Sequence, residues 1–81
     1  MGVQAAYGRI EADMRGIWGD MAPAMLRKRL RDVQADLSTL SRDELQKIVE
    51  LLRQKTLPSI LGEDGADTKA RQYLAWVDDS G

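Results

Sequence analysis

The sequence predicts an all-α protein, a small bundle of about four helices. Three observations carry this prediction: apolar residues recur at helical spacing along most of the chain, helix-forming residues dominate the composition, and Ser41 with Glu44 forms a capping box. A chain of 81 residues is the size of one domain, so we expect residues 1–81 to form a single helical domain. The expected helices cover residues 3–19, 23–37, 41–55 and 67–78.

The first predicted helix carries an apolar seam at alternating steps of four and three residues. Its glycines lower the intrinsic helix propensity, so this helix depends on burial of the seam. Two interpretations stay open: the seam packs on its own domain, or it packs between chains. We therefore assign residues 1–21 as an oligomerisation or docking helix and residues 24–78 as the helical core. The seam consists of Val3, Tyr7, Ile10, Met14, Ile17 and Met21.

The second and third predicted helices follow the same apolar pattern. Pro23 fits the first turn of the second helix, because its missing N–H is not needed there. Ser41 caps the third helix, and Leu57–Pro58 is expected to end it because the residue before proline avoids helical dihedrals. The two buried stripes are Leu26, Leu30, Val33 and Leu37, and then Leu45, Ile48, Val49 and Leu52.

Residues 62–65, Gly-Glu-Asp-Gly, are predicted to form a plain loop. Asp67 or Thr68 is then expected to cap the last helix. Its apolar stripe is Ala70, Tyr73, Leu74 and Val77.

The composition excludes most catalytic chemistry. The chain has no cysteine and no histidine, which removes disulfides, thiolate metal sites and the usual acid–base groups at neutral pH. No phosphate-binding glycine motif or nucleophile with a neighbouring base is present. We therefore expect no enzyme, no metal and no cofactor. The absence of a long apolar run and of a signal-like N-terminus predicts a soluble intracellular protein of the cytoplasm or nucleus, without membrane contact.

Two surfaces are candidates for partner binding. Methionine and aromatic residues are common in interface cores, and they gather near the junction of the first two helices. The candidate partner-binding residues are Tyr7, Met14, Trp18, Met21 and Met25. A basic patch at Arg27, Lys28 and Arg31 could meet nucleic-acid phosphates, or could simply be a solvated helix face with acidic neighbours.

The pattern from Arg31 onward resembles the extraterminal (NET) domain of bromodomain-containing transcription regulators. The resemblance lies in Arg31–Leu37, Leu40–Leu52 and Pro58–Ile60, and in Ala70, Tyr73, Trp76 and Val77. It thus covers parts of residues 31–60 and 70–77, and it implies a three-helix module that binds short peptides of chromatin regulators.

The sequence favours a non-enzymatic protein–protein interaction module. Such a module would self-associate, with a homodimer expected, or would dock a helix or peptide of a partner, as an adaptor in transcription regulation would. The first alternative is a small nucleic-acid-binding regulator that uses the basic second helix. The second alternative is a docking or assembly segment of a multi-protein machine, in which the acidic C-terminal region and the basic helix act as complementary ends.

Overall fold

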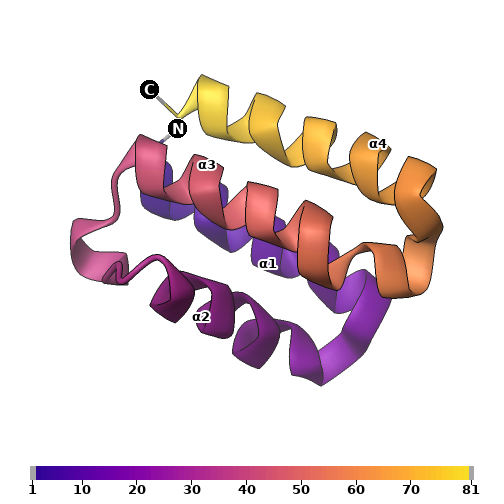
Figure 1. The fold of residues 1–81 in the computed structure, drawn as a ribbon. Coiled ribbons are helices and arrows are strands. Elements are labelled where there is room, and N and C mark those ends of the chain that lie inside the picture. The colour runs from indigo at the N-terminus through magenta and orange to yellow at the C-terminus, as the bar shows by residue number, and fades with distance from the viewer. Residues whose placement is uncertain (1, 81) are drawn as a thin grey trace.

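The computed structural model describes residues 2–80, and this part of the chain is helical with no strand. Helices α1 (Val3–Trp18), α2 (Ala22–Asp32), α3 (Arg42–Leu51) and α4 (Pro58–Asp79) alternate in direction, so α1 begins and α4 ends at the same end of the molecule (Figure 1). The all-α class is confirmed. Shorter helical turns lie at Gly19–Met21, Leu37–Thr39 and Leu52–Thr56.

The hydrophobic core is built from one face of each long helix. Helix α1 contributes Ile10 and Met14, both fully buried, and contacts α2, α3 and α4. Tyr7, Ile10 and Met14, the middle of the apolar seam, therefore pack within the chain itself, which is one of the two interpretations open from the sequence. The other large, fully buried side chains are Leu26, Leu45, Ile48, Val49, Leu52, Leu57, Tyr73 and Val77.

Helix α2 ends at Asp32, five residues before the predicted end at residue 37. The reason is a Schellman motif in which the N–H of Ala35 donates to the carbonyl of Leu30, while the N–H of Gln34 donates to that of Arg31. Gln34 takes the left-handed dihedral that this motif requires, with φ of 56°. Glycine usually occupies this position, so a glutamine there is not recognisable as a stop signal.

Helix α3 begins with the predicted capping box. The N–H of Glu44 donates to Ser41 Oγ at 3.1 Å, and the N–H of Ser41 donates to Glu44 Oε1 at 2.9 Å. Leu40 and Leu45, on either side of the cap, are both buried. This helix start could be predicted from the sequence because Ser41 and Glu44, the two partners of the capping box, lie only three residues apart.

The predicted break at Leu57–Pro58 is wrong. Leu57 keeps helical dihedrals, and its N–H donates to the carbonyl of Leu52 across a π-turn at Leu52–Thr56. Proline in a regular helix clashes with the carbonyl four residues earlier, and the wider π-turn gives its ring more room. The third predicted helix therefore continues through the π-turn into the first residues of α4, before the kink at Gly62, without a loop. Because α3 and α4 follow each other in this way, the predicted count of about four helices is slightly off.

The predicted loop at residues 62–65 is also wrong, because the change of direction is concentrated in one residue. Gly62 has φ of 72° and ψ of 176°, while the residues around it are helical. Helices α3 and α4 run antiparallel, so the chain turns back at this kink (Figure 1). Thr68 lies inside α4 and donates to the carbonyl of Asp64, so neither it nor Asp67 caps a helix.

No helix among residues 2–80 combines the length and apolar character needed to cross a membrane.

We expect Gly62→Ala to lower the free energy of unfolding by about 1–3 kcal/mol, because the dihedrals of Gly62 are almost exclusive to glycine. Gly8→Ala is the matched control. An added Cβ at Gly8 meets no atom within 4 Å inside α1, so this change should stabilise the protein by about 0.5–1 kcal/mol. Urea unfolding measures both, and a Gly62→Ala protein as stable as the wild type would contradict the kink.

Candidate functional site

An open groove of about 530 Å³ lies between the end of α2 and the outer face of α3. We call it the α2–α3 groove. Val33 and Leu51 supply its apolar surface, and polar side chains surround them. Its lining residues are Val33, Asp43, Gln46, Lys47, Glu50, Leu51 and Gln54.

The groove exists because two apolar side chains fall outside the buried stripes. Leu51 lies on α3 beside the stripe that ends at Leu52, and it is only partly buried. Val33 was expected in the buried stripe of the second helix. Because α2 ends at Asp32, Val33 sits at the helix cap instead, where it is partly buried and faces the groove.

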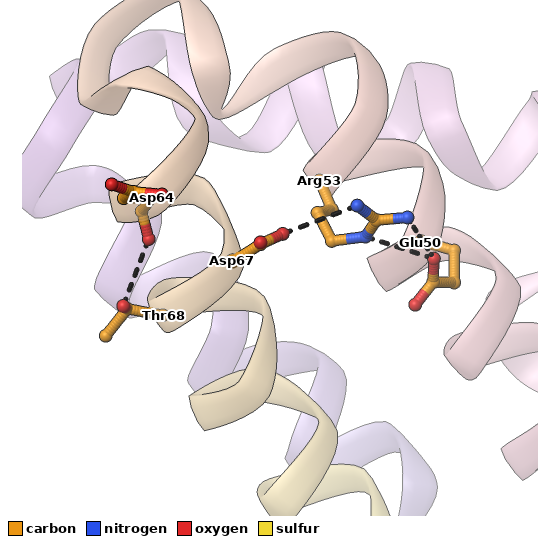
Figure 2. A network of polar contacts seen from close by, with 5 residues as sticks. All are labelled: Glu50, Arg53, Asp64, Asp67 and Thr68. Carbon is orange, nitrogen blue, oxygen red and sulfur yellow. Dashed lines mark hydrogen bonds and ion pairs between the residues drawn. The ribbon is translucent and has the colours of Figure 1, made fainter.

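One wall of the groove is stabilised by a charged network that reaches α4. Arg53 donates from Nε and Nη2 to Glu50 Oε2 at 3.2 and 3.1 Å, and from Nη1 to Asp67 Oδ1 at 3.3 Å. Figure 2 shows the guanidinium between the two carboxylates. Hydrogen bonding to Glu50, more than to Asp67, raises the pKa of Arg53 above its ordinary value. The network joins the π-turn to α4 and gives Glu50 a paired position.

A second polar cluster fastens α1 to α4. The hydroxyl of Tyr73 donates to Asp13 Oδ2 at 2.6 Å, and Lys69 Nζ lies 3.1 Å from the same oxygen. Burial, and then the hydrogen bond to Asp13, raises the pKa of Tyr73. A phenol with a raised pKa is a weaker proton donor and does not become a nucleophile at neutral pH. The geometry of this cluster supports a structural role.

The candidate partner-binding residues do not form one surface. Met14 is fully buried and Tyr7 is 6% exposed. The prediction that both residues form an open docking surface is therefore wrong, because both belong to the core. Trp18 and Met25 are partly buried against that core, and only Met21, 66% exposed, is open to a partner. The seam was correctly located in the sequence, but its inner and outer members could not be separated without the positions of the other helices.

Tyr7 does reach a surface cavity of about 480 Å³, where it lies with Glu11 and Arg27. Burial and the charge of Glu11 raise the pKa of Tyr7, while Arg27 opposes them. This cavity brings together one residue from each of the two predicted sites.

The predicted basic patch is exposed but divided. Arg27, Lys28 and Arg31 are all exposed on α2. Arg27 lines the cavity beside Tyr7, whereas Lys28 lines a different cavity next to the π-turn. The structure therefore does not direct the three side chains at one shared ligand.

Sequence reasoning missed the groove and both charged clusters. Leu51 was the available signal, because it is an apolar residue that does not fit the stripe of Leu45, Ile48, Val49 and Leu52. In residues 2–80, no three acidic side chains gather in a way that could hold a metal ion.

No protein-family model, curated protein or solved structure matches this chain. The resemblance to extraterminal domains stays a prediction.

We expect Tyr73→Phe to lower the free energy of unfolding by about 1–2 kcal/mol at neutral pH, through loss of the hydrogen bond to Asp13. The pKa of Tyr73 is raised in the folded protein, so the unfolded chain loses this proton first, above about pH 10. Stability should therefore fall as the pH rises above that value, and less steeply in Tyr73→Phe. Urea titrations at several pH values measure the slope, and equal slopes for both proteins would contradict this assignment.

Proposed function

We propose that this protein is a non-enzymatic interaction module that docks an amphipathic helix of a partner protein in the α2–α3 groove. The observation that carries the proposal is the outward position of Leu51. This leucine lies on α3 beside the buried stripe, is only partly buried, and lines a groove together with Val33. Covering both side chains with apolar residues of a partner would remove them from water.

The dimensions of the groove suit a short helix. Its lining runs along the chain from Asp43 to Gln54. At 1.5 Å per residue this length is about 16 Å, which corresponds to about three turns of a docked helix. Partner helices of this kind present apolar residues three and four positions apart.

The charged residues at the rim of the groove favour a partner with a particular charge pattern. Glu50 is paired with Arg53, whereas Asp43 and Lys47 form no ion pair within residues 2–80. A docked helix with a basic side chain near Asp43 and an acidic one near Lys47 would complement both charges. Such rim charges contribute mainly to specificity and to the rate of association.

The other predicted roles have less support. Self-association through α1 would require the seam to be free, but Tyr7, Ile10 and Met14 are already buried within the chain. Nucleic-acid binding would require the basic side chains of α2 to act together, but Arg27 and Lys28 line separate cavities. The docking of a partner helix uses surface that the fold leaves available.

The proposal predicts that amphipathic helical peptides selected from a library against the wild-type protein bind at the groove. In nuclear magnetic resonance spectra of the labelled protein, their addition should shift the amide signals of Val33, Lys47 and Leu51. Leu51→Glu should weaken binding by more than about tenfold, because it places a charge in the apolar centre of the interface.

Ile60→Glu is the matched control. Ile60 is an apolar residue that is 57% exposed and lies outside the groove, so the same charge there should leave the affinity unchanged. Selected peptides that shift only signals outside the groove, or that bind Leu51→Glu as tightly as the wild type, would contradict the proposal. A library that yields no binder would also contradict it.

A further inference from the structure

A small cavity of about 230 Å³ lies between α2 and the π-turn at Leu52–Thr56. We call it the cationic pocket. Its lining is Met25, Lys28, Arg29, Lys55, Thr56 and Ser59, which includes three basic side chains and no carboxylate. The pocket is separate from the α2–α3 groove, since the two share no lining residue.

Arg29 is the unusual member of this pocket. It is only 8% exposed, although arginine is rarely buried unless it is fully paired. One nitrogen, Nη1, lies 3.1 Å from Asp32 Oδ2, but the buried Nε donor has no hydrogen-bond partner in residues 2–80. A buried donor without a partner is unfavourable, so the guanidinium of Arg29 is only partly paired by the described residues.

The lysines of the pocket are also without a counter-charge. Lys28 and Lys55 form no ion pair within residues 2–80, while Arg53, two residues before Lys55, is held by Glu50 and Asp67. Asp32 offsets only one of the three basic groups around the cavity. The local charge is therefore strongly positive, in a chain whose formal net charge is −1.

The backbone around the pocket is itself irregular. The π-turn supplies Lys55 and Thr56, and Ser59 fixes its end by donating from Oγ to the carbonyl of Thr56 at 2.8 Å. Single π-turns inside helices are rare and occur frequently at functional sites. Here the π-turn places Lys55 opposite Lys28 and Arg29 of α2.

We propose that the cationic pocket binds a phosphate group, either as free inorganic phosphate or as the terminal group of a small phosphomonoester. A cavity of about 230 Å³ is smaller than the usual range for drug-sized ligands, so it suits one small oxyanion. Guanidinium and ammonium groups form short, charge-assisted hydrogen bonds with phosphate oxygens. The guanidinium of Arg29, which lines the pocket, and the two lysines supply these bonds, and Asp32 keeps the guanidinium in place.

Calorimetric titration of the wild-type protein with inorganic phosphate, at constant ionic strength, tests this site. We expect saturable binding, and an affinity loss of about tenfold or more in the double variant Lys28→Gln, Lys55→Gln, because two charged hydrogen bonds are removed. Both lysines are exposed, so the fold should tolerate these changes. Arg15→Gln with Arg71→Gln removes the same charge from exposed positions outside the pocket and should keep the wild-type affinity.

A parallel titration with methyl phosphate separates the two sources. Binding of both ligands identifies a pocket open to phosphomonoesters, and binding of inorganic phosphate alone identifies a site for the free ion. Arg29→Lys, which keeps the charge but removes the guanidinium donors, should also weaken binding, and its helical circular dichroism shows whether it folds. The absence of saturable phosphate binding to the wild type would overturn the proposal. Equal affinities of the two double variants would overturn it as well.

Discussion

The burial of the α1 seam inside the chain's own core is the constraint on which the rest of the structure depends. Ile10 and Met14 have no exposed surface, and α1 contacts each of the other long helices. A helix of this length with glycines at positions 8 and 16 is marginal alone, so packing must supply most of its stability. The hydrogen bond from Tyr73 to Asp13 and the ion pair from Lys69 then fix α1 against α4.

Because the seam faces inward, interaction surfaces must come from irregularities on the outside of the bundle. The Schellman motif ends α2 early, which leaves Val33 at the edge of the groove beside Leu51. The π-turn before Pro58 brings Lys55 toward α2 and encloses the cationic pocket with Arg29. Both concave sites therefore arise where a helix departs from regular geometry.

Sequence reasoning succeeded where the signal was local. The capping box at Ser41 and the buried stripe of α3 depend on residues within a few positions of each other, and both are confirmed. It failed where one residue acted against its usual preference: Gln34 adopts a left-handed dihedral, and Leu57 stays helical before proline. For α1, the same periodic seam fits packing within or between chains, so Tyr7 and Met14 could not be assigned to core or surface. The groove could not be predicted without knowing where α2 ends, although Leu51 could be recognised from the sequence as an apolar residue outside the α3 stripe.

Amide hydrogen exchange, measured across a dilution series, tests the central claim most directly. If α1 belongs to the core of the single chain, the amides of Ile10 and Met14 should be as protected as those of Ile48 and Val49 in α3. That protection should also be independent of protein concentration, because global unfolding would be needed to expose both helices. Fast exchange of α1 on dilution, with α3 still protected, would show that the seam is buried only between chains and would contradict this account.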